Sequence, residues 1–185
     1  METLEKPLFE YHEKPRILFM GHDFGRKGGW DLLKVFSEHF ADKAELHLVT
    51  GYPVTSSLKS VFIHSGISSY TEQWHLLFNL SDIFVMTSYA EALGHVFQEA
   101  AGHGLALVGS NVGGIPEMCL HGDNGFIVEP GDHEALTSAL ERLITDRTLL
   151  LQMRKRSREL AEERFDASKN FRRMADLFQS VSESV

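Results

Sequence analysis

The sequence has few of the residues that define several classes of protein. A single cysteine, Cys119, excludes an internal disulfide framework and a metal site built from several cysteines, so we expect a reducing, cytoplasmic compartment. No apolar run approaches the length of a membrane span, and no basic leader follows Met1, so we expect neither an anchor nor a leader. With 5 prolines, 15 glycines and 43% hydrophobic residues among 185, the composition excludes collagen-like and disordered classes. We therefore expect a globular domain with a folded site.

Basic residues are scarce over most of the chain. The net charge is -8, from 18 lysines and arginines against 26 acidic residues, and neither lysine nor arginine occurs between Lys59 and Arg142. This balance argues against binding to nucleic acid or to an anionic membrane surface. The positive charge for a phosphorylated ligand must therefore come from the few cations before this gap, from backbone N–H groups or from histidine.

Six short apolar runs alternate with helical patterns along the chain. Each run is nearly continuous in Ile, Leu, Val and Phe, as is typical of parallel strands that helices cover on both faces. The predicted strands span residues 16–21, 45–50, 60–65, 82–87, 105–110 and 124–129.

The intervening patterns predict helices over residues 28–40 and 93–104, a third opening at a Ser69/Glu72 capping box, and a fourth capped by Asp132. Two more are predicted over residues 148–164 and 166–181. This alternation predicts an α/β fold with a doubly wound, six-stranded parallel sheet flanked by helices. In such a sheet, ligands bind at the carboxyl ends of the strands.

Two glycine-rich loops follow predicted strands. Residues 21–29 hold Arg26 and Lys27, and a backbone that approaches closely at a helix start suits a diphosphate. A solvated turn with two surface cations is about as good an interpretation. Residues 111–117 contain Gly113 and Gly114, which allow either close approach to an anion or a tight connection.

Two carboxylates belong to the segment after the fourth predicted strand. Glu91 lies in the loop, and Glu99 lies inside an otherwise apolar helix, where a carboxylate is costly without a partner. Together they could line one ligand, whereas taken alone they fit a helix-start acid and a surface glutamate. The 10 histidines lack the spacing of a metal site, so we predict no metal. The basic run from Arg154 to Arg158 is predicted to be a solvated helix face.

Taken together, these motifs resemble the carboxy-terminal, donor-binding domain of GT-B glycosyltransferases, most closely family 4. The resemblance covers nearly the whole chain. It is carried by the E-x7-E spacing of Glu91 and Glu99 within EALGHVFQEA, by Lys27 before a glycine, by GGIPE at residues 113–117, and by NGFIV at residues 124–128 leading to PGD. This ordered set is far more specific than any one motif.

The resemblance implies a nucleotide-sugar site. Lys27 and Arg26 would hold the diphosphate, Glu91 would contact the transferred sugar, and Glu99 would accept hydrogen bonds from the ribose hydroxyls. Lys27 and Glu91 are thus the implied catalytic residues. The other implied ligand contacts are Gly94, His95, Val96, Gly113, Gly114 and His22. His22 stands where the family commonly has arginine, which makes one phosphate contact weaker or pH-dependent.

The implied function is sugar transfer from a nucleoside diphosphate sugar to an unidentified acceptor, with retention of configuration, no metal and no further cofactor. We expect a flexible segment over residues 1–14, the donor-binding domain over 15–165, and a helix over 166–185 that crosses to a missing amino-terminal acceptor domain. The isolated half should be inactive, and that helix could promote self-association. Two alternatives stay open: a noncatalytic sugar-nucleotide-binding module or partner subunit, and a sugar-nucleotide epimerase.

Overall fold

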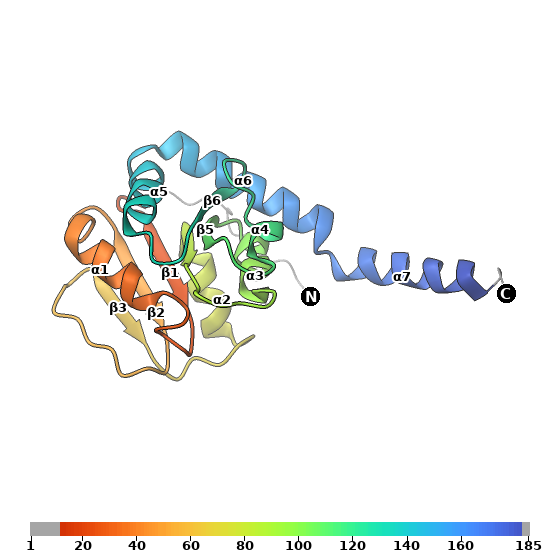
Figure 1. The fold of residues 1–185 in the computed structure, drawn as a ribbon, viewed down its shortest axis with the longest axis horizontal. Coiled ribbons are helices and arrows are strands. Elements are labelled where there is room, and N and C mark those ends of the chain that lie inside the picture. Colours follow the sequence, from red (N-terminus) through yellow and green to blue (C-terminus); the bar gives the residue numbers. More distant parts are fainter. Residues whose placement is uncertain (1–11, 183–185) are drawn as a thin grey trace.

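The structure is a computed structural model, and residues 12–182 are described (Figure 1). Six strands form one parallel sheet in the order β3-β2-β1-β4-β5-β6. They are β1 (Arg16–Met20), β2 (Glu45–Val49), β3 (Val61–His64), β4 (Ile83–Met86), β5 (Ala106–Ser110) and β6 (Gly125–Val128). The predicted fold class is confirmed, and every strand ends within one residue of its prediction. Most of the expected amino-terminal segment, residues 1–11, lies outside the described residues.

Helices follow the strands as the sequence predicts. They are α1 (Gly29–His39), α2 (Glu72–Asn79), α3 (His95–Gly102), α4 (Ile115–Met118), α5 (His133–Thr145), α6 (Arg147–Arg164) and α7 (Ala167–Ser182). Asp132 caps α5 as predicted, because its side chain accepts a hydrogen bond from the Ala135 N–H. The prediction of Ser69 as the cap of α2 is wrong. Thr71 caps this helix by accepting from the Trp74 N–H, after Tyr70 turns the chain with a φ of 64°.

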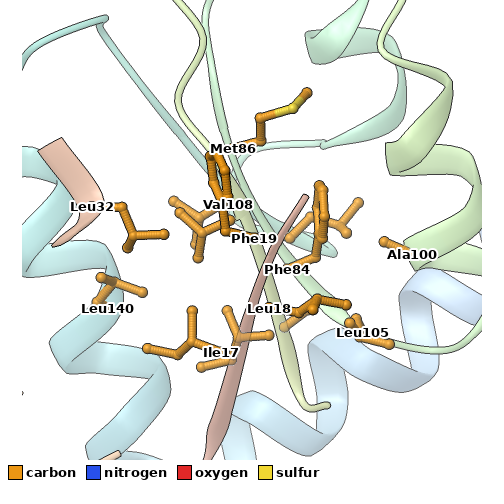
Figure 2. Close-up of a cluster of buried hydrophobic side chains, with 14 of the residues drawn as sticks. Ile17, Leu18, Phe19, Leu32, Phe84, Met86, Ala100, Leu105, Val108 and Leu140 are labelled. Atoms are coloured by element: carbon orange, nitrogen blue, oxygen red, sulfur yellow. The ribbon is translucent and has the colours of Figure 1, made fainter. Parts of the chain in front are cut away.

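The core lies on both faces of the central strands. Every residue of β4 and β5 is buried, as expected of strands covered on two sides. Figure 2 shows Leu32 of α1 and Leu140 of α5 on one side of β1, with Ala100 of α3 on the other. This packing holds the carboxyl ends of β1 and β4 together, since the two strands are paired neighbours.

A buried ion pair lies at the opposite, amino-terminal edge of the sheet. Asp82 precedes β4, and one of its oxygens lies 2.6 Å from Nη1 of Arg154 on α6. The two side chains are 3% and 7% exposed. Asp82 also accepts a hydrogen bond from the Arg16 N–H, and Arg154 donates one to the Gly104 carbonyl. The prediction of a solvated face is therefore wrong for Arg154, which belongs to the buried stripe of α6.

The last helix is exposed along its whole length. Helix α7 projects away from the sheet in Figure 1, and none of its residues is buried. Its apolar side chains are 47–68% exposed and share one side of the helix: Phe171, Met174, Leu177, Phe178 and Val181. Within residues 12–182, no helix has the length and apolarity needed to cross a membrane.

Candidate functional site

A cavity of about 750 Å³ opens at the carboxyl edge of the sheet. It is lined by the loops that follow β1, β2, β3 and β4, by the start of α3, and by Trp74 of α2. This is the edge where a parallel sheet offers a ligand several loops and helix starts at once. Six of the predicted site residues line it: His22, Lys27, Glu91, Gly94, His95 and Val96.

Lys27 and Glu91 form an ion pair across the cavity wall. The Lys27 Nζ donates to Oε2 of Glu91, and the two side chains are 17% and 13% exposed. Burial opposes ionisation of Glu91, but the hydrogen bond and charge of Lys27 outweigh it and lower the pKa of the carboxyl. The site therefore presents a carboxylate and an ammonium group side by side.

The glycine after Lys27 explains how the two loops come so close. Gly28 has a φ of 78°, and a Cβ there would lie 2.3 Å from the carbonyl oxygen of Thr87. Only glycine allows this approach, which brings the first loop against the end of β4. Both loops are therefore held at the distance that the Lys27–Glu91 pair requires.

Arg26 ties the same two loops together from outside the cavity. Its guanidinium donates to the Ala90 carbonyl at 2.6 Å and to Asp23, and its own carbonyl accepts from the Tyr89 N–H. The Tyr89 hydroxyl in turn donates to Asp31 of α1, which also lies 2.8 Å from His133. Arg26 does not line the cavity, although it adjoins Lys27, which does.

Gly113 and Gly114 do not line the cavity either, because they lie behind the loop that carries Glu91. A Cβ on Gly113 would lie 2.0 Å from the Glu91 carbonyl oxygen. The Gly114 N–H donates to the Ala92 carbonyl at 2.9 Å. The structure thus shows these glycines supporting the loop that carries Glu91, and their contact with a ligand stays a prediction.

The Gly113→Ala variant should be strongly perturbed. Its φ of 55° already disfavours alanine, and the new methyl group would collide with the Glu91 backbone. We expect a loss of about 2–4 kcal/mol in the free energy of unfolding, measured by urea denaturation. Gly122→Ala is the matched control, because Gly122 has a φ of 83° with nothing within 4 Å, and should lose only about 1 kcal/mol. Equal losses in the two variants would contradict this account.

Three histidines line the cavity, and burial disfavours the charged form of one of them, His64. His64 Nε2 lies 3.0 Å from Nδ1 of His47. Burial lowers the pKa of His64, and burial followed by the charge of His64 lowers the pKa of His47 to about 4. His22 lies against Gly51, and His95 is the first residue of α3. Among the described residues that line the cavity, Lys27 is the one lysine or arginine.

Glu99 contacts the cavity indirectly, through Trp74. The Trp74 Nε1 donates to Oε2 of Glu99 at 2.9 Å, and Trp74 rather than Glu99 lines the cavity. Trp74 is not among the site residues predicted from the sequence. Its place in the first turn after a strand-to-helix loop is the signal that could have identified it, because such turns lie at the carboxyl edge of the sheet.

The assembled groups suit an anionic, hydroxylated ligand. Helix α3 begins at His95, no side chain caps its first turn, and His95 and Val96 of that turn line the same cavity as Lys27. Helix starts and ammonium groups both stabilise phosphate oxygens. A carboxylate beside them accepts hydrogen bonds from hydroxyl groups. No cluster of three or more metal-ligating side chains occurs within residues 12–182.

Known proteins resemble this chain in sequence and in fold. The family model described as "Glycosyl transferases group 1" matches residues 1–161. The N-acetyl-alpha-D-glucosaminyl L-malate synthase of Bacillus anthracis is 37% identical over 93 residues, which cover 50% of this chain and 24% of that protein. The chain therefore spans much less than the length of this relative.

Solved structures share the fold. A sucrose-phosphate synthase from Thermosynechococcus elongatus superposes with a TM-score of 0.78 at 23% identity, over 98% of this chain and 48% of that one. HepE from Anabaena, solved in complex with UDP-glucose, gives a TM-score of 0.75 at 19% identity over 91% of this chain and 49% of that one. The chain corresponds to about half of each structure.

Proposed function

Because the chain belongs to the group 1 glycosyl transferases, we propose that it is the carboxy-terminal, donor-binding domain of a retaining family 4 enzyme. The observation that carries this proposal is the Lys27–Glu91 pair at the start of α3, inside a cavity of about 750 Å³. The donor is a nucleoside diphosphate sugar, in keeping with the UDP-glucose bound to HepE. In this proposal, the binding site for the acceptor lies in a part of the enzyme that this chain does not contain.

In this proposal, different residues bind different parts of the donor. Lys27 and the N–H groups at the start of α3 hold the diphosphate, with Arg26 adding positive charge at the mouth. Glu91 accepts hydrogen bonds from the transferred sugar. Because Lys27 is paired with Glu91 before the donor binds, the diphosphate must share or replace that carboxylate as the partner of the ammonium group.

The chemistry follows from the charge that develops on the leaving group. As the bond between sugar and diphosphate breaks, negative charge accumulates on the departing phosphate oxygens. Each donor placed against such charge lowers the barrier by about 2.7–4 kcal/mol, by analogy with oxyanion holes. Lys27 is the cation that lines the cavity, so most of this electrostatic stabilisation depends on it.

Helix α7 fits the same proposal. Its exposed apolar side lacks the cover that such a surface normally has in a stable protein. We propose that it packs against an amino-terminal, acceptor-binding domain, and that the chain alone binds donor without transferring sugar. A domain of this kind, supplied in trans, should restore transfer and reduce self-association through α7.

A thermal-shift panel of UDP, GDP and ADP sugars tests donor binding directly. A ligand present at about 100 times its dissociation constant should stabilise the chain by roughly 2.7 kcal/mol. The matching nucleosides, which lack the diphosphate, serve as controls and should give little shift. If no sugar nucleotide raises the melting temperature, donor binding by this chain is disproved.

A further inference from the structure

Trp74 is held rigidly at the wall of the cavity. Its indole N–H donates to Glu99 at 2.9 Å, and its ring packs edge-to-face on Phe78, with centroids 5.6 Å apart and planes 70° apart. Thr71, three residues before Trp74, caps the helix, and its side chain accepts a hydrogen bond from the Trp74 backbone N–H. Backbone, indole nitrogen and ring are therefore each restrained.

Trp74 has two environments. It packs partly against the core, to which the buried Leu77 and Phe78 of the same helix belong, and it also lines the cavity together with Ser68 and Ser69. Because the indole nitrogen already donates its hydrogen bond to Glu99, the rest of the ring offers an apolar, planar surface. Rigid aromatic surfaces of this kind bind planar ligands at low entropic cost.

We propose that Trp74 is the surface on which the nucleotide base of the donor stacks, and that Glu99 is a positioning residue that fixes the indole. The inference rests on the proposed function and adds a residue to it. It assigns the two ends of the ligand to different groups: the diphosphate to Lys27, and the base to Trp74. Because every base has an aromatic face, stacking here is expected for UDP, GDP and ADP alike.

Trp74→Leu tests the assignment by calorimetry with UDP, GDP, ADP and inorganic pyrophosphate. Leucine keeps an apolar side chain but cannot stack, so we expect about a tenfold loss of affinity for whichever nucleotides bind the wild-type chain. Affinity for pyrophosphate should stay within about twofold, since it has no base. Trp74→Phe, which keeps a smaller ring, should recover part of the lost affinity. It keeps the test decisive if the leucine variant fails to fold.

The positioning role of Glu99 is tested with two variants that differ in whether they can accept the hydrogen bond of the Trp74 indole. Glu99→Gln keeps an oxygen that accepts from Nε1 and should therefore lose less nucleotide affinity than Glu99→Ala. Glu99→Ala frees the ring and should resemble Trp74→Leu, again with unchanged pyrophosphate binding. If Glu99→Ala and Glu99→Gln lose equal affinity, the positioning role is wrong.

Fluorescence gives an independent readout, because the chain has 2 tryptophans. Trp30 packs on Phe24 and Tyr52 outside the cavity, so Trp30→Phe leaves Trp74 as the single indole. Nucleotide should quench the emission of this protein, and pyrophosphate should not. Nucleotide binding with unchanged emission and an unaffected Trp74→Leu variant would overturn the inference while the proposed function stands. Failure of the wild-type chain to bind any of the three nucleotides would overturn both.

Discussion

The Lys27→Ala protein is expected to bind nucleoside diphosphates roughly 30- to 150-fold more weakly than the wild-type chain. A charge-assisted hydrogen bond contributes about 2–3 kcal/mol, which corresponds to that range of affinity. The loss is large because no other lysine or arginine lines the described cavity, and because Glu91 is left without its ion-pair partner beside the phosphates. Isothermal titration calorimetry measures the effect.

Lys34→Ala is the matched control for this experiment. Lys34 lies exposed on α1, outside the cavity, so the control removes the same charge from the same region of the chain. It should change affinity by less than about twofold, as expected for a screened surface charge. Lys27→Ala with unchanged affinity and an intact fold would remove the lysine from the site.

The Lys27–Glu91 pair also links stability to pH. The pKa of Glu91 is lowered in the folded chain, so the pair stabilises the fold above the ordinary pKa of a glutamate. That contribution disappears as the pH falls through the lowered pKa, because the carboxyl becomes protonated. Lys27→Ala should therefore flatten the acid side of a plot of stability against pH.

The Arg154→Met protein is expected to lose about 3–5 kcal/mol of unfolding free energy. Methionine fills a similar volume but leaves the buried Asp82 carboxylate without the guanidinium 2.6 Å away. It also leaves the Gly104 carbonyl without its donor. Urea denaturation measures the change, and nucleotide affinity extrapolated to the folded protein should stay unchanged.

Arg156→Met provides the comparison, since it lies on the same helix. Arg156 pairs with Asp123 and Glu159 at the surface, where such pairs contribute about 0–1 kcal/mol. Adding Asp82→Asn to Arg154→Met should recover part of the stability, because the unpaired charge is then removed. If the Arg154 and Arg156 variants are equally stable, the buried pair does not hold this edge of the sheet.

The strands and the region of the site could be predicted from sequence because their signals are local. Continuous apolar runs such as that of β5 occur only where helices cover both faces, and the order of strands and helices then places all the loops at one edge. Lys27 and Glu91 follow adjacent strands, and the structure places both on the wall of one cavity. Their roles toward a donor remain predictions.

Contacts between distant segments could not be predicted in this way. The buried stripe of α6 includes Arg154 because helical spacing places it with Leu150 and Ser157, but its partner Asp82 lies 72 residues away in sequence. Trp74 reaches Glu99 only once two helices pack together. Likewise, the sequence leaves open whether Gly113 and Gly114 approach an anion or make a tight connection, because it does not show which backbone they meet.

The two ends of the strands hold two different ion pairs, one buried in the structure and one on the cavity wall. The strands that join them have four or five residues, about 13–17 Å, so the Asp82–Arg154 pair and the Lys27–Glu91 pair are too far apart to share contacts. Free-energy changes at such distances are additive to within a few tenths of a kcal/mol. Substitutions around the Asp82–Arg154 pair could therefore raise the thermal stability of this domain, while separate substitutions around the Lys27–Glu91 pair change its ligand preference. The two sets of variants could be selected independently and then combined.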